Sequence, residues 1–272
     1  LEVYEPSRLI SVTIGAAVAA FVFALLGSIR QEPEIAAEAA EKARSQNFMQ
    51  TLKEIVLPDR QVRLFFTIVM FTFIGTLAQD DFLEPYGALV LNMEVGETTR
   101  LTAFWGIGVL ISMLLSGLFL LKWLGYMRLM RAGIIASIAV FIGVIATGLA
   151  GNPGAFRMLV LVMGLATGLA GAGMLSGVIT FTTSIRAGML MGVWGMANLL
   201  GKAIGGLMGG VVIDLMRLGF GDAFLAYAAL FVLEIIMLVT AFILTTRLDI
   251  QESRAAQELS LIHISEPTRL RR

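Results

Sequence analysis

The chain has 272 residues, of which 57% are hydrophobic and 15% charged, and its mean hydropathy is +0.85. A soluble domain of this size needs more polar surface than this composition can supply, so soluble classes are excluded. The formal net charge is zero and there are no cysteines, which excludes disulfides and thiolate metal sites. The single histidine, His263, lies near the end of the chain, so the apolar part has no histidine for catalysis or metal ligation.

Seven apolar stretches are each near the ~20 residues that an α-helix needs to cross a bilayer. They are predicted at 9–28, 62–80, 102–121, 130–150, 157–181, 188–213 and 223–246. Between the first two lies the only long polar segment, whose middle, 34–44, has strong helix formers with charges four residues apart. That spacing predicts a surface helix. The sequence therefore predicts an all-α integral membrane protein with seven transmembrane helices.

The distribution of Lys and Arg predicts the orientation in the membrane. If the polar segment is cytoplasmic, the residues on its side are Arg30, Lys42, Arg44, Lys53, Arg60, Arg63, Lys122, Arg128, Arg131, Arg186, Arg247 and Arg254. The opposite side has only Arg8, Arg100, Arg157 and Arg217. This bias places the polar segment and the C-terminus in the cytoplasm, with the acidic residues between 80 and 97 facing outward.

The order of elements resembles part of a transporter of the major facilitator type, in which a cytoplasmic linker joins two six-helix halves. We therefore expect 1–28 to hold helix six of the parent fold and 29–61 to be the linker. Residues 62–250 would form the C-terminal six-helix half, and 251–272 a cytoplasmic tail. About 260–272 resemble a translated adaptor sequence, and we expect the chain to be a fragment.

Two charged residues lie deep in apolar surroundings, Lys202 and Glu234. A lone charge at the centre of the bilayer costs about 2.5–3.5 kcal/mol on insertion scales. The two predicted helices are sequential and antiparallel, so both side chains reach a similar depth. We predict a Lys202–Glu234 contact, shared with Asn198, which serves either as a structural clamp or in ion coupling or ligand binding.

The helix predicted at 188–213 carries a small residue at every fourth position. These residues are Ala197, Gly201, Gly205 and Gly209. Such a stripe allows another helix to approach closely. The same glycines would also serve a sliding or gating motion, and the sequence leaves both interpretations open.

Polar residues gather where the second predicted span meets the next loop. Gln79, Asp80 and Asp81 end that span, Pro85 is expected to stop the helix, and Gly87 to free the backbone. The plain interpretation is an acidic exterior turn. Against it, Gln79 and Asp80 still lie within the apolar span, and amide and carboxylate oxygens are the hard ligands that suit Mg²⁺.

The next predicted span begins with a second polar group. Glu97 and Arg100 lie three residues apart there, and Thr98 or Thr99 is the expected N-cap.

These two segments resemble the hallmark of the bacteriochlorophyll-delivery family (PucC/LhaA type), a branch of the major facilitator superfamily. The matching residues are Gln79, Asp80, Leu83, Glu84, Pro85, Tyr86 and Gly87, then Val95, Gly96, Glu97, Thr98, Thr99, Arg100, Leu101 and Thr102. Asp81 and Phe82 depart from a stretch that is often aliphatic in that family. The broader resemblance covers roughly 62–250.

The resemblance implies a factor for assembling light-harvesting complexes that binds or delivers (bacterio)chlorophyll as transient cargo. Gln79, Asp80 and Glu84 are then the candidates for Mg or polar pigment contacts, with Phe82, Pro85 and Tyr86 shaping the site. No metal held by the protein itself is expected.

The implied partners are the lipid bilayer, antenna polypeptides and pigment-synthesis enzymes, without nucleic acid. The implied location is the inner, intracytoplasmic or thylakoid membrane of a phototrophic bacterium.

Two alternatives remain open. The first is a secondary transporter of a small solute, with Asp80 or Glu234 as the protonatable group. The second is a pigment-free scaffold that binds antenna polypeptides through its glycine-rich helices. No catalytic constellation is visible, so we do not expect an enzyme.

Overall fold

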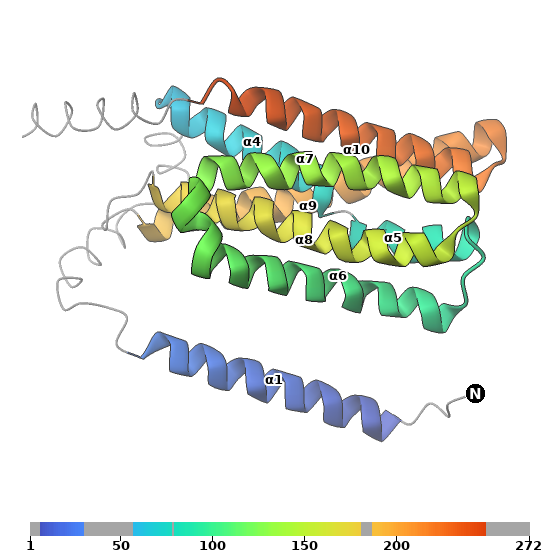
Figure 1. Cartoon of the computed structure of the whole chain (residues 1–272), viewed down its shortest axis with the longest axis horizontal. Helices are drawn as coiled ribbons and strands as arrows, with labels where there is room; N and C mark the ends of the chain where they lie inside the picture. Colours follow the sequence, from blue (N-terminus) through green and yellow to red (C-terminus); the bar gives the residue numbers. More distant parts are fainter. Residues whose placement is uncertain (1–5, 30–56, 78, 181–186, 249–272) are drawn as a thin grey trace, which may run out of the picture. The chain divides into compact units, whose positions relative to one another are not determined.

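The computed structural model describes residues 6–29, 57–77, 79–180 and 187–248 (Figure 1). The chain divides into two units, Leu1–Gln46 and Asn47–Arg272. The first unit contains α1 (Pro6–Ser28), which corresponds to the first predicted span. The surface helix predicted at 34–44 and the tail at 251–272 lie outside the described residues.

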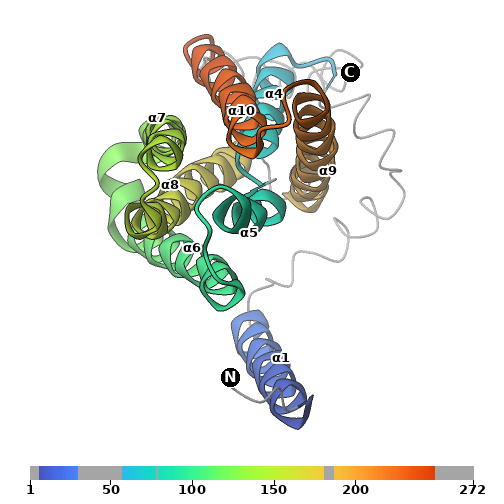
Figure 2. The ribbon, with the colours of Figure 1, turned by 90° about the vertical axis from the view of Figure 1, so that its right-hand side faces the viewer.

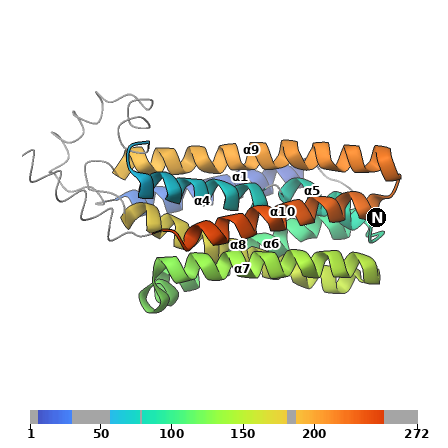
Figure 3. The ribbon, with the colours of Figure 1, turned by 90° about the horizontal axis from the view of Figure 1, so that it is seen from above.

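The second unit is a bundle of helices. They are α4 (Arg60–Thr76), α5 (Gln79–Leu89), α6 (Val95–Leu115), the π-helical turn η2 (Ser116–Leu120), α7 (Leu121–Ala150), α8 (Pro153–Thr180), α9 (Ala187–Phe220) and α10 (Ala223–Thr245). Seen end-on, α8 lies between α6 and α7 (Figure 2). From above, α4 lies between α9 and α10 and packs on both (Figure 3).

Among the described residues, five helical stretches are long and apolar enough to cross a membrane. One of them, Val95–Ala150, has 56 residues and contains Gly125, whose φ of 71° and ψ of 161° are not helical. The chain reverses there, so α6 and α7 run in opposite directions (Figure 1). The protein is thus an all-α integral membrane protein, as its composition predicts.

Close contact between helices depends on glycine. A Cβ atom at Gly164 of α8 would overlap the backbone oxygen of Trp105 in α6, and one at Gly108 of α6 would overlap that of Leu161. Reciprocal glycines therefore let α6 and α8 approach backbone to backbone.

The second predicted span, 62–80, is not one continuous helix. α4 ends at Thr76 and α5 begins at Gln79, so the helical path is interrupted before the polar residues rather than after them. Pro85 does not stop the helix, since it lies inside α5. Membrane helices tolerate an internal proline when neighbouring groups satisfy the freed backbone.

The start of α6 also differs from the prediction. The N-cap is Glu94 rather than Thr98 or Thr99, and its backbone N–H donates to Glu97 Oε2 at 3.4 Å. Both threonine hydroxyls instead donate to the backbone oxygen of Val95, one turn back. The helix therefore begins at Val95, seven residues before the predicted boundary at 102. The hydropathy pattern missed these residues because the first two turns of the helix are polar.

Candidate functional site

Gln79 is the first residue of α5, directly after the interruption that follows α4. Its side chain is only 1% exposed. Neither its amide nitrogen nor its amide oxygen has a hydrogen-bond partner among the described residues. Buried polar atoms are nearly always satisfied in proteins, so an unsatisfied carboxamide in an apolar bundle is a candidate for binding a ligand.

Glu234 lies in the middle of α10 and is 3% exposed. Both carboxyl oxygens also have no geometrically acceptable hydrogen-bond partner in the described part of the chain. The Gln79 side chain is nevertheless close enough to interact with this carboxyl group. The two side chains therefore form a buried polar pair, but no hydrogen bond of acceptable geometry joins them.

Gly75 brings α4 and α10 together beside this pair. A Cβ atom there would lie 3.2 Å from the backbone oxygen of Glu234 and 2.9 Å from Leu238 Cγ. Because Gly75 precedes the helix interruption by only two residues, this contact fixes the position of α10 relative to the start of α5.

Gln79 and Glu234 together offer amide and carboxyl groups in a region of low dielectric constant. Such groups can hydrogen-bond a polar group of a ligand, hold a proton, or give a hard oxygen ligand to Mg²⁺. No cluster of three or more His, Cys, Asp or Glu side chains occurs among the described residues, so a metal bound here would need ligands of its own.

The predicted contact between Lys202 and Glu234 is not formed. The carboxyl oxygens of Glu234 accept no hydrogen bond from a described residue, and no ion pair joins them to Lys202. Lys202 and Asn198 are half-buried on α9. Similar depth along two helices does not bring two side chains together, because the direction in which each helix faces depends on its packing.

Tyr86 belongs to the core rather than to an open site. It is fully buried, and its ring contacts Phe156 at 5.2 Å, Phe231 at 5.2 Å and Tyr227 at 5.7 Å between centroids. Gly148 makes room for it, because a Cβ there would overlap the Tyr86 hydroxyl. This residue therefore holds α5 in the bundle.

Other residues of the predicted site anchor α5 to its neighbours. Phe82 is buried, and a Cβ at Gly209 of α9 would lie 2.5 Å from its ring. Glu84 accepts a hydrogen bond from Thr102 Oγ1 of α6 at 3.3 Å, and Pro85 is half-buried. The side chain of Asp80 lies outside the described residues. Among the predicted pigment contacts whose side chains are described, only Gln79 has buried polar atoms that lack a hydrogen-bond partner.

The segment from Gly87 to Arg100 is held by a contact that the sequence did not indicate. Glu97 of α6 forms an ion pair with Arg157 of α8, which lies far away in the sequence. Gly96 and Arg100 are exposed. A Cβ atom at Gly87 would lie 3.2 Å from the side chains of both Met93 and Thr98. The segment therefore fastens the ends of three helices.

The stripe of small residues on α9 faces its neighbours. Ala197, Gly201, Gly205 and Gly209 are all buried. A Cβ at Gly201 would lie 2.6 Å from Phe73 Cβ of α4. Together with the contact of Gly209 on Phe82, this places α9 against both sides of the interruption between α4 and α5.

The comparisons with known proteins agree with one another. The model of the PUCC protein family matches residues 1–253. Protein PucC of Cereibacter sphaeroides is 30% identical over 241 residues, which cover 86% of this chain and 52% of that protein. The bacteriochlorophyll synthase 44.5 kDa chain of Rhodobacter capsulatus is 30% identical over 250 residues, or 87% of this chain and 57% of that one. The chain thus spans about half the length of these relatives, and no solved structure matches it.

Proposed function

Because the chain belongs to the PUCC protein family, we propose that it is part of a factor for assembling photosynthetic complexes. In this proposal it binds or delivers (bacterio)chlorophyll within the photosynthetic membrane, with its C-terminus in the cytoplasm. The printed name of one relative, a bacteriochlorophyll synthase chain, supports a connection with this pigment. The major facilitator architecture remains part of the proposal.

The buried pair of Gln79 and Glu234 is the observation that favours a polar cargo over a purely structural role. An amide oxygen suits the hard Mg²⁺ of a chlorin, and a protonated carboxyl group can donate to a carbonyl on its ring. The unsatisfied atoms of both side chains fit such groups. Glutamine is also a weaker ligand than histidine, which suits transient binding better than permanent binding.

The proposed partners are antenna polypeptides, which would receive the pigment, and pigment-synthesis enzymes, which would supply it. We assign no catalytic step to this chain. In the proposal, the buried pair provides hydrogen-bonding groups to the cargo.

An absorption spectrum of the chain, purified in mild detergent from a pigment-producing host, tests the proposal. We expect a red band that co-elutes with the protein in fixed stoichiometry and is lost in Gln79→Leu. Asp81→Asn is the matched control, because Asp81 lies on the same helix but is exposed. A colourless wild-type protein that still retains antenna polypeptides would replace pigment binding with the scaffold function.

Glu234 also favours a second candidate, proton-coupled transport of a small solute, because carboxyl groups buried in membrane helices commonly form proton relays. Reconstituted vesicles with an imposed proton gradient would test this function. Gradient-driven flux that disappears in Glu234→Gln would support it, and flux that is unchanged in that variant would exclude Glu234 as the coupling group.

A further inference from the structure

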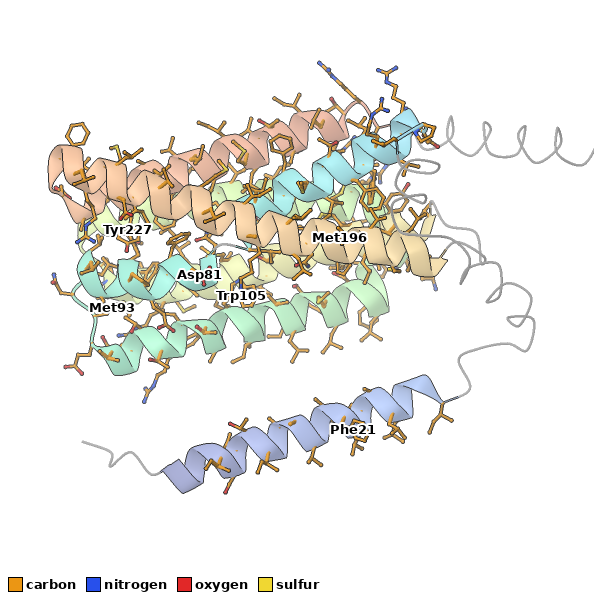
Figure 4. The ribbon with its side chains drawn as sticks, turned by 180° about the vertical axis from the view of Figure 1, so that it is seen from behind. Phe21, Asp81, Met93, Trp105, Met196 and Tyr227 are labelled. Carbon is orange, nitrogen blue, oxygen red and sulfur yellow. The ribbon has the colours of Figure 1, made fainter. Side chains whose placement is uncertain are left out.

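An apolar groove of about 540 Å³ lies between α4 and α9, and neither Gln79 nor Glu234 lines it. On α4 it is lined from Arg63 to Ile74, and on α9 from Val193 to Leu200. Met196, which lies along its α9 wall, is labelled in Figure 4. The only polar side chains in its lining are Arg63 and Thr67.

A second cavity, of about 250 Å³, adjoins one end of this groove. It is lined by Arg60, Arg63 and Arg247 together with Leu64, Thr67 and Leu244. Arg63 and Thr67 line both cavities, so the apolar groove and the cluster of three guanidinium groups share part of their lining on α4.

No ion pair joins these three arginines to a carboxylate in the described part of the chain. Arg63 donates to the backbone oxygen of Leu57. The nearest acidic residue in sequence, Asp59, is engaged as the N-cap of α4 and accepts from the backbone N–H groups of Gln61 and Val62. The cluster therefore carries a net positive charge that favours an anion.

The groove has the length of one leaflet. From Arg63 to Ile74 the helix rises ~16 Å at about 1.5 Å per residue, and half of a bilayer core measures ~15 Å. With Arg63 at the level of the phosphate head groups, the far end of the groove would reach the centre of the membrane. This depth matches a lipid with its head at the arginines and one chain along α4.

We propose that the groove and the adjoining arginines form a binding site for an anionic phospholipid. The phosphate would contact Arg60, Arg63 and Arg247, since guanidinium groups form paired hydrogen bonds with phosphate. One acyl chain would lie between α4 and α9. An esterified chlorophyll has no anionic group, so it would leave the three arginines without a partner. This site is independent of the pigment proposal.

Lipid retention tests the site. The purified chain, exchanged into detergent with equal amounts of phosphatidylglycerol and phosphatidylcholine, should retain phosphatidylglycerol preferentially, measured by native mass spectrometry. Replacing the three arginines together by glutamine should weaken retention roughly fivefold per arginine. The matched control is Lys122→Gln with Arg128→Gln, two exposed basic residues of α7 that line neither cavity.

A second variant tests the apolar part separately. Met70→Trp should fill the groove and reduce retention of phosphatidylglycerol, while a short-chain phosphatidylglycerol still competes at the arginines. Circular dichroism checks that each variant remains helical. Equal retention of both lipids, or no effect of the triple replacement, would overturn the proposal. So would displacement of the lipid by inorganic phosphate alone, or loss of pigment rather than lipid in Met70→Trp.

Discussion

The hydroxyl group of Tyr86 in α5 donates a hydrogen bond to the backbone oxygen of Val144 in α7, at 2.9 Å. The two residues are 58 positions apart, so this bond and the surrounding aromatic rings join helices that are distant in the sequence. A residue of the predicted family hallmark is therefore a central element of the fold.

Tyr86→Phe should lower the free energy of unfolding by about 1 kcal/mol, because it removes one buried hydrogen bond and keeps the ring. Tyr86→Ala should cost ~3–5 kcal/mol, because it also leaves a cavity among the aromatic side chains. Denaturant unfolding in detergent measures both. If Tyr86→Phe lost pigment while remaining as stable as the wild type, the residue would be a ligand contact instead.

The contact between α6 and α8 predicts that alanine substitutions at two glycines of α8 change the stability of the protein very differently. Gly164→Ala should destabilise the protein by ~1–3 kcal/mol, because the new methyl group overlaps the backbone of Trp105. Gly171→Ala is the control on the same helix, since a Cβ there has no atom within 4 Å. It should be neutral or slightly stabilising, because alanine is the better helix former. Equal melting temperatures for the two variants would contradict this close packing.

The ion pair of Arg157 and Glu97 should contribute little to stability. The two side chains are 36% and 40% exposed, so solvent screens their attraction. Glu97→Gln should lower the free energy of unfolding by less than about 1 kcal/mol, and its effect should shrink in high salt. A loss that persisted at high salt would show that Glu97 acts mainly through the backbone of Glu94.

Much of the fold follows from local sequence, since a run of apolar residues long enough to span a bilayer has few alternatives to a helix. The interruption before Gln79 was not predictable in this way, because the visible breaker in the segment is Pro85, which lies inside α5. The reversal between α6 and α7 agrees with the separate spans predicted at 102–121 and 130–150, but its exact place at Gly125 was hidden among many glycines, of which few adopt a positive φ.

The site was predictable in its members more than in its contacts. Gln79 and Glu234 both stand out as polar residues in apolar spans, but they are 155 residues apart, as their numbers show. Their proximity depends on Gly75, which lets α4 and α10 meet, and on the rotation of α10 about its axis. Neither can be deduced from depth alone, and depth alone favours Lys202 as the partner of Glu234.

A double-mutant cycle distinguishes the two possible partners of Glu234. The single variants Gln79→Leu, Lys202→Met and Glu234→Gln are combined in pairs, and the free energy of unfolding is measured for each. Residues in contact show coupling of about 0.5–3 kcal/mol, whereas independent residues add within about 0.3–0.5 kcal/mol.

We expect coupling between Gln79 and Glu234, because their side chains interact in the absence of other hydrogen-bond partners in the described structure. Lys202 and Glu234 should be additive. The reverse result, coupling to Lys202 and additivity with Gln79, would restore the charge pair and remove the buried amide–carboxyl site. Because Gln79→Leu and Glu234→Gln nearly preserve side-chain volume, a coupling energy between them reports on the polar interaction rather than on a cavity.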